Sequence, residues 1–380
     1  MLISGARAPV ALGFGRAFAA AGYEVHFVDS VDSLMVRWSC FGAGRLHRVP
    51  GPKGQFAAFR KAIGALIGKL DPCLIIPTCE EVFYLSQAAE LDGFADLLLA
   101  PPLKTLRSLH SKAEFAQLAG ECGLKPPRTW RATCADDLRE YEERSSELVF
   151  KPEFSRFGAE TLVRPAKDQV KKLRASRDKP WVIQEYISGE EVCVWSAARA
   201  GKLVAAAGYR PKWHFGGASA YFERDDDPGL IEACEKLAAH TQATGQLSLD
   251  LIRSAKGELR PIECNPRAVS GVQLFDGDPR LAQALAGQRS ELVTPRVEAC
   301  HVGPAFWLAA VAGSVRRGGL AHALRDAGRS RELLTRSGGV GVPIGAMLDA
   351  ARFALKGVRA GRSSVEESTA DIEWNGGRIA

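Results

Sequence analysis

This 380-residue sequence lacks the cysteine motifs that mark redox-active pairs and zinc sites. It contains nine cysteines, but none form a C-x-x-C pair and none have the spacing of a zinc site. Most of them lie in apolar runs, where a free thiol behaves as a small hydrophobic side chain. We therefore expect neither a disulfide framework nor a zinc-binding module, and we expect a reducing, cytoplasmic setting.

Long hydrophobic runs are also missing. The most apolar late stretch, GPAFWLAAVAGSV at 303–315, is shorter than the roughly 20 residues that a membrane-spanning helix needs. The N-terminal residues MLISG resemble a buried first strand, and no basic segment followed by a long apolar core marks a signal peptide. The sequence predicts a soluble protein.

Positive charge exceeds negative charge only slightly, with 50 Lys and Arg against 44 Asp and Glu. No basic run with interleaved aromatic residues suggests a nucleic-acid groove, so the partners we expect are anionic small molecules. With 46% hydrophobic and 25% charged residues, the composition is globular, and the length fits two or three domains of about 100 to 150 residues.

The first hundred residues alternate between strand and helix patterns, which predicts a parallel sheet with helices on both faces. Ligands of such sheets bind at the carboxyl ends of the strands. The residues at those predicted ends are Gly5, Arg7, Asp29, Thr78 and Glu81. The stretch GFGRAF at 13–18 also permits a dinucleotide-site interpretation, but its third glycine is missing and its two glycines fall inside a helical pattern.

A second unit begins near residue 110. Ser111 and Glu114 have the spacing of a capping box, which places Lys112 in the first turn of a helix as either a solvated lysine or a ligand. From residue 148 the pattern changes to antiparallel strands. Lys151 ends the first of them, and the polar loop EFSRFGAE at 153–160 can either cover an anion or form a flexible hairpin.

The stretch RPIECNPRAVSG at 260–271 carries the most informative spacing. Residues two apart on a strand point to the same face, so Glu263 and Asn265 present a carboxylate and an amide side by side. Asp250 lies on the preceding predicted strand and can join them. Such oxygen donors suit magnesium. The alternative is a half-buried edge strand with two solvated polar residues.

In order and separation, these motifs resemble the ATP-grasp ligase superfamily over roughly residues 1–290. The matching pieces are the Rossmann-like start, the SK helix start, VFKPEFSRFG, VIQEYISGEE and LDLIRSAKGELRPIECNPR. The resemblance implies an α/β fold, in which a Rossmann-like pre-ATP-grasp domain at 1–105 precedes an ATP-grasp domain at 106–290, divided into subdomains 106–187 and 188–290. A helical extension with a polar tail occupies 291–380.

The resemblance also implies a role for each site residue. The residues implied to bind ATP are Lys112, Lys151, the flap residues Ser155, Arg156, Phe157 and Gly158, the hinge residues Gln184, Glu185, Tyr186 and Ile187, and Glu191. Two magnesium ions, or manganese, would be held by Asp250, Glu263 and Asn265, while Arg267 would steady the transferring phosphate. Catalysis would depend on Arg267, Glu263 and Lys151. The candidate substrate contacts are Arg210, Lys212, Glu81, Ser270 and Gly271. Gln184 departs from the acid that many members have, but its amide can still accept a hydrogen bond from adenine.

The implied reaction activates a carboxylate as an acyl phosphate and couples it to an amine, with release of ADP and phosphate. The alternatives are a thiol, ammonia or bicarbonate acceptor, or a nucleotide-binding regulatory protein without catalysis. A homodimer is compatible with the sequence. The helix pattern IGAMLDAARFALKGVRAGR at 344–362 is amphipathic and basic, which fits either packing on the body or contact with a membrane surface or partner.

Overall fold

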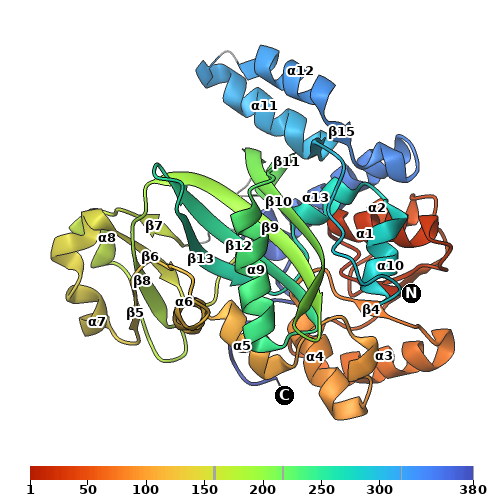
Figure 1. Ribbon diagram of the computed structural model, residues 1–380, viewed down its shortest axis with the longest axis horizontal. Helices are drawn as coiled ribbons and strands as arrows, with labels where there is room; N and C mark the ends of the chain where they lie inside the picture. The colour runs from red at the N-terminus through yellow and green to blue at the C-terminus, as the bar shows by residue number, and fades with distance from the viewer. Residues whose placement is uncertain (157–159, 216–217, 318, 380) are drawn as a thin grey trace.

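The architecture consists of three β-sheets with helices between and around them (Figure 1). The structure is a computed structural model that describes residues 1–156, 160–215, 218–317 and 319–379. Within these ranges, no helix combines the length and hydropathy needed to cross a membrane.

The N-terminal sheet is parallel, with strand order β3-β2-β1-β4, as the alternating sequence pattern predicts. Its strands are β1 (Leu2–Ser4), β2 (His26–Asp29), β3 (Leu46–Arg48) and β4 (Ile75–Ile76). The helices of this unit are α1 (Pro9–Ala20), α2 (Leu34–Arg37), α3 (Phe56–Leu70) and α4 (Glu81–Asp92), followed by the 3₁₀ turn η1 (Ala95–Leu97).

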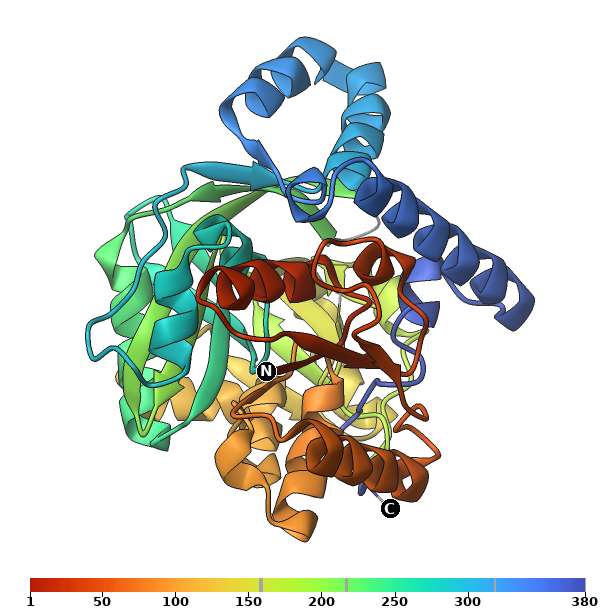
Figure 2. The same ribbon diagram turned by 90° about the vertical axis from the view of Figure 1, so that its right-hand side faces the viewer.

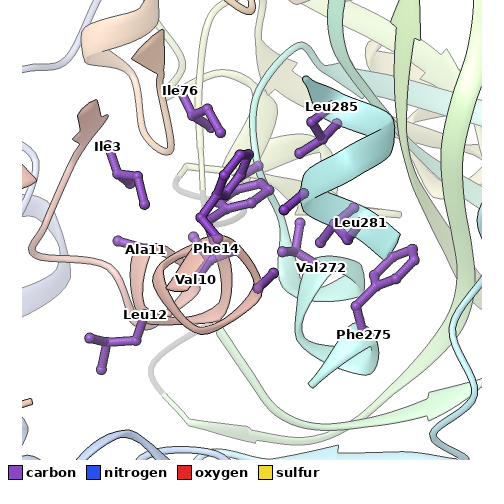
Figure 3. Close-up of a cluster of buried hydrophobic side chains, with 14 of the residues drawn as sticks. Ile3, Val10, Ala11, Leu12, Phe14, Ile76, Val272, Phe275, Leu281 and Leu285 are labelled. Carbon is purple, nitrogen blue, oxygen red and sulfur yellow. The ribbon is translucent and has the colours of Figure 1, made fainter. Parts of the chain in front are cut away.

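Successive side chains of these strands point to opposite faces of the sheet and so contribute to two different hydrophobic cores. Ile3 and Ile76 pack with α1, whereas Leu2 and Ile75 pack with α3 and α4. Figure 3 shows Phe14 of α1 among strand residues on one side and residues of later helices on the other. The N-terminal unit therefore shares one of its cores with the rest of the chain.

The second sheet is antiparallel and has strand order β5-β8-β6-β7. Its strands are β5 (Thr129–Ala132), β6 (Leu148–Pro152), β7 (Leu162–Val163) and β8 (Trp181–Glu185). The helices before and beside it are α5 (Leu103–His110), α6 (Lys112–Glu121), α7 (Ala135–Arg139), η2 (Glu142–Glu147) and α8 (Lys167–Val170). Ser111 caps α6 by accepting from the Glu114 backbone N–H at 3.1 Å. A capping box would also have the Glu114 carboxylate accept from the Ser111 backbone N–H. Instead, this carboxylate accepts from Ser108 at 2.8 Å and pairs with Arg107.

The third sheet has seven strands in the order β13-β12-β9-β10-β11-β14-β15. They are β9 (Gly189–Arg199), β10 (Lys202–Phe215), β11 (Ala218–Arg224), β12 (Gly245–Ser254), β13 (Leu259–Asn265), β14 (Ala299–His301) and β15 (Arg331–Glu332). Its helices are α9 (Pro228–Thr241), η3 (Ser270–Phe275) and α10 (Pro279–Leu285). On β9, Val194 packs toward α9 and Trp195 packs toward α1, so the sheet is buried on both faces.

The C-terminal region is helical and returns to the N-terminal unit. It comprises α11 (Gly303–Arg317), α12 (Gly319–Arg329), η4 (Thr335–Ser337), α13 (Gly341–Ala360) and α14 (Ser364–Glu367). In Figure 2, α11 and α12 stand above the body, and the chain then runs back past the first sheet. Residues 369–379, which we call the tail, end there. Trp374 of the tail stacks on Phe83 of α4 at 4.6 Å between ring centroids.

Candidate functional site

A cavity of about 530 Å³ lies between the second and third sheets. It is lined by side chains from β6, β8, β9, β10, β12 and β13, so both antiparallel sheets contribute to it. The lining residues that the sequence predicted are Lys151, Ser155, Gln184, Glu185, Tyr186, Ile187, Glu191, Asp250, Glu263, Asn265, Arg267 and Ser270. The structure thus brings most of the predicted set to one place.

The acidic wall of this cavity is set by strand register. Asp250 on β12 is the antiparallel partner of Glu263 on β13, and the register shifts just beyond this pair, between Asp250 and Leu251. The Asn265 amide donates to Asp250 Oδ2 at 3.0 Å and lies 3.5 Å from Glu263 Oε1. Three oxygen-bearing side chains therefore converge from two adjacent strands.

Charge is unevenly divided within this wall. Burial and the neighbouring Glu263 raise the pKa of Asp250 to about 8. Burial alone would raise the pKa of Glu263 as well, but Lys112 and Lys151 outweigh it and hold that pKa at about 2. Glu263 is thus the ionised member of the pair in neutral solution.

Two lysines flank Glu263. Lys112 Nζ lies 3.6 Å and Lys151 Nζ 3.8 Å from Glu263 Oε2. Both ammonium groups also donate to backbone carbonyls, Lys112 to Ser155 at 3.1 Å and Lys151 to Ile262 at 3.3 Å. Burial lowers the pKa of Lys151 to about 8, although Glu263 opposes this shift. Both lysines are buried cations rather than solvated surface charges, and Lys151 lines the cavity.

The start of α6 is tied to the loop that follows β6. Ser111 Oγ donates to the Glu153 carboxylate, which is fully buried and also pairs with Arg131 of β5 at 2.6 Å. Because Lys112 follows Ser111 directly, this link fixes the position of the lysine relative to Lys151 and the loop.

The hinge between the two sheets carries the predicted nucleotide-reading residues. Gln184 Nε2 donates to Thr129 Oγ1 at 3.1 Å and to the Ile262 carbonyl at 3.3 Å, which fixes the orientation of its side-chain amide. Tyr186 is partly exposed, and the Arg164 guanidinium lies 5.2 Å from its ring centroid. Glu191 on β9 lines the same cavity.

Arg267 brings a guanidinium to the acidic wall. Its Nη2 donates to Asn265 Oδ1 at 3.3 Å, and its Nη1 donates to the Ala268 carbonyl at 3.1 Å. The Asn265 amide is therefore oriented from both sides, toward Asp250 through its nitrogen and toward Arg267 through its oxygen.

Several predicted site residues lie elsewhere. Arg156 pairs with Glu80 and with Glu373 of the tail, each at 2.9 Å, and lines a different cavity. Glu81 is buried in the N-terminal unit, where it accepts from Ser4 Oγ at 2.6 Å and from the Thr78 backbone N–H. Gly271 is a packing position, because a Cβ there would come within 2.8 Å of Trp195 Cβ. Phe157 and Gly158 lie outside the described residues.

The predicted substrate cations on β10 are engaged by acids of β11 and the segment after it. Lys212 Nζ pairs with Glu223 Oε2 at 2.5 Å, and Arg210 lies 3.5 Å from the same carboxylate and 3.7 Å from Asp225. The cavity is lined instead by their neighbours Tyr209 and Pro211. Alternation along the strand places residues 210 and 212 on one face of the sheet and residues 209 and 211 on the other.

Further lining residues were not found from the sequence, namely Cys193, Tyr209, Pro211, His214 and Ser219. Strict alternation would put His214 on the face of Arg210 and Lys212. The left-handed backbone of Trp213, with φ of 52°, interrupts this alternation and lets His214 line the cavity. No sequence signal marks that interruption, because tryptophan rarely adopts this conformation.

The donor set fits magnesium. No cluster of three His, Cys, Asp or Glu side chains suited to a metal occurs in the part of the chain that the structure describes, so the third donor would be the Asn265 amide oxygen, which here accepts from Arg267 at 3.3 Å. Asp250 and Glu263 are half-buried carboxyl groups on adjacent strands, and burial together with repulsion from Glu263 raises the pKa of Asp250. A hard divalent cation relieves that repulsion, and carboxylate and amide oxygens are the ligands it prefers.

Comparison with known proteins reveals a similarity of fold. No model of a known protein family matches the sequence, and no curated protein matches it significantly. Among solved structures, phosphoribosylamine–glycine ligase from Thermotoga maritima has a TM-score of 0.61 at 18% identity and covers 79% of each chain. The L-amino acid ligase from Bacillus licheniformis has a TM-score of 0.55 at 16% identity, covering 75% of this chain and 73% of that one.

A third similar structure is the biotin carboxylase domain of 2-oxoglutarate carboxylase from Hydrogenobacter thermophilus, determined as a dimer with MgADP, ADP and bicarbonate. Its TM-score is 0.57 at 13% identity, covering 76% of this chain and 70% of that one. The shared class is an α/β architecture in which two antiparallel sheets enclose a cavity beside a parallel sheet. More specifically, this chain has the ATP-grasp fold, preceded by a Rossmann-like unit and followed by a helical extension.

Proposed function

We propose that this protein is an ATP-dependent ligase that converts a carboxylate into an acyl phosphate and couples it to an amine, releasing ADP and phosphate. The observation that carries this proposal is the placement of ionised Glu263 between two buried lysines and opposite Asp250. Cations and acids alternate there at the wall of a cavity that also contains the hinge residues. Phosphoryl transfer from a nucleotide requires such an arrangement.

Each residue then has a defined task. Lys112 and Lys151 hold the nucleotide phosphates, and the hinge from Gln184 to Ile187 holds the adenine, with Glu191 at the ribose. Asp250, Glu263 and Asn265 would hold magnesium, which offsets the charge that develops on the transferring phosphoryl oxygens. Arg267, oriented by Asn265, steadies the same phosphoryl group. Ser155, which lines the cavity, would lie near the phosphates, where exclusion of water protects an acyl phosphate.

The amine acceptor is the finer part of the proposal. Two of the similar structures are ligases named for glycine and for L-amino acids, which supports a small amino-acid-like acceptor. We place it beside Ser270, with His214 and Ser219 on the neighbouring wall of the cavity. Bicarbonate is the second candidate for the acceptor, because another similar structure contains it.

Product analysis tests the reaction. The purified protein is incubated with Mg-ATP and pooled amino and carboxylic acids, while phosphate, ADP, AMP and new masses are followed. ADP and phosphate together with an adduct one water lighter than two pool members would establish the ligase and identify its substrates. Formation of AMP would contradict the acyl-phosphate route. ATP binding without consumption in the presence of pooled amines, thiols, ammonia and bicarbonate would favour a regulatory role.

A further inference from the structure

Helix α13 has a solvent-facing apolar stripe. The stripe consists of six large apolar side chains, each between 43% and 81% exposed: Val340, Ile344, Met347, Leu348, Leu355 and Val358. With 3.6 residues per turn, these positions fall within a sector of about 100° around the helix axis. A contiguous surface of this kind indicates a contact site, whereas isolated exposed apolar residues do not.

The other side of α13 is firmly held, so the stripe does not result from loose packing. Gly345 lies against the backbone of α2, where a Cβ would come within 2.8 Å of the Leu34 carbonyl carbon. The Asp349 carboxylate accepts from the Met35 backbone N–H at 3.0 Å. These contacts fix the rotation of α13 about its axis and direct the stripe away from the body, and in Figure 2 the end of this helix extends beyond it.

Basic side chains border the stripe. Arg352, Lys356 and Arg359 are exposed and occupy the sector next to it, each about one helical turn apart. Asp349 lies toward α2 and pairs with Arg352 at 3.6 Å, so Lys356 and Arg359 carry the positive charge of the exposed border. Trp38, which is 43% exposed, lies beside the start of the helix, with its Cβ 3.9 Å from the position of a Cβ on Gly341. Tryptophan favours the boundary between water and lipid.

From this combination, we propose that α13 docks the protein on an anionic phospholipid surface. The helix would lie in the plane of the surface, with its apolar stripe between the acyl chains and its basic border at the phosphate groups. A second copy of this chain fits less well, because α13 offers no exposed acidic side chain to pair with the basic border of the other copy.

Vesicle co-sedimentation of the whole chain tests the proposal. One set of vesicles contains phosphatidylcholine alone, and the other an equal mixture of phosphatidylcholine and phosphatidylglycerol. We expect the protein to pellet with the mixed vesicles and to remain in solution with the neutral ones. Raising the salt from 0.1 M to 1 M, which shortens the screening length from about 10 Å to about 3 Å, should release it.

Two variants separate the two parts of the surface. Leu355→Gln with Val358→Gln removes apolar area, and Lys356→Gln with Arg359→Gln removes charge. Each pair should weaken binding to mixed vesicles by at least about tenfold. The matched controls are Leu91→Gln with Val163→Gln, exposed at 53% and 57%, and Lys171→Gln with Arg174→Gln, which have the same three-residue spacing in the segment that follows α8. Both controls should bind as the unchanged protein does.

Three outcomes would overturn the proposal. The first is no binding to mixed vesicles. The second is equal binding to neutral and mixed vesicles, which would remove the role of the basic border. The third is a dimer, measured by light scattering, that the Leu355 and Val358 substitutions convert to a monomer, because the stripe would then be the contact between two copies.

Discussion

Asp250 on β12 faces Glu263 on β13 as its direct antiparallel partner, and the pKa values of these two half-buried carboxyl groups are displaced in opposite directions. The difference arises because Lys112 and Lys151 stand beside Glu263, while Asp250 faces the negative charge of its partner. The pair therefore has one ionised member and one readily protonated member until a cation joins it.

Substituting Glu263 tests the center of the proposed site. Glu263→Gln preserves the size of the side chain but removes the charge between the two lysines, so turnover should fall by about 10²-fold or more while the protein remains folded. ATP hydrolysis coupled to product formation measures the effect, and circular dichroism checks the fold. Glu258→Gln, an exposed change on the β12–β13 hairpin, is the control and should have no effect. Unchanged turnover in Glu263→Gln would remove this residue from the mechanism.

Lys151 is predicted to bind the nucleotide phosphates. Lys151→Met keeps the aliphatic stem but removes the charge, so the dissociation constant for Mg-ATP should rise by about tenfold or more. Calorimetric titration gives this constant directly. Lys202→Met, at an exposed lysine at the start of β10, should bind Mg-ATP as the unchanged protein does. If Lys151→Met binds with unaltered affinity, the phosphates lie elsewhere.

The raised pKa of Asp250 predicts how stability depends on pH without metal. Its folded pKa of about 8 lies above the ordinary aspartate value of 3.8, so the folded state binds the proton more tightly than the unfolded chain. The contribution of Asp250 is thus fully present below about pH 4 and is lost as the pH rises to about 8. Denaturant titrations of metal-free protein should show this decline, and Asp250→Asn should remove it. A decline of the same size in Asp250→Asn would assign it to other groups.

Metal binding should release protons for the same reason. A divalent cation needs the ionised form of Asp250, so binding below pH 8 displaces its proton. Calorimetry of magnesium binding at pH 7 in two buffers of different ionisation enthalpy should show this release. The Asp250→Asn variant should bind magnesium more weakly and without that release. Identical heats in both buffers for the unchanged protein would contradict the assignment.

The tail contributes to stability through Trp374. Its ring is 5% exposed and packs on Phe83, His110 and Phe154, so Trp374→Ala should lower the free energy of unfolding by about 3 kcal/mol. Chemical denaturation measures this loss. Trp38→Ala, at a tryptophan that is 43% exposed, should cost much less. Equal losses in the two variants would mean that the tail contact adds nothing specific.

Local patterns predicted much of the fold. The alternation of strands and helices in the first hundred residues predicted the parallel sheet, and Ser111 predicted the start of α6, where its hydroxyl accepts from the Glu114 backbone N–H at 3.1 Å. The spacing of Glu263 and Asn265 placed both side chains on one wall, because strand alternation held there.

Other features depend on contacts that sequence spacing does not encode. The family resemblance that suggested Arg210 and Lys212 as substrate contacts gives no indication of which face of β10 meets the cavity. The positive φ of Trp213 then changed the face of His214. Arg156 was drawn away from the predicted nucleotide site by Glu373, more than two hundred positions later in the chain. The participation of β14 and β15 in the third sheet also depends on distant pairing.

The return of the tail has a consequence for the order of events during synthesis. Asp371 binds Arg7 across 364 positions, and Trp374 completes a core begun by Leu2 and Phe83. On the ribosome, the first sheet must therefore wait, with part of its apolar surface uncovered, while nearly all of the following chain is made. The N-terminal unit should accordingly be the region most dependent on chaperones during translation, even though its own strands and helices are among the first to form.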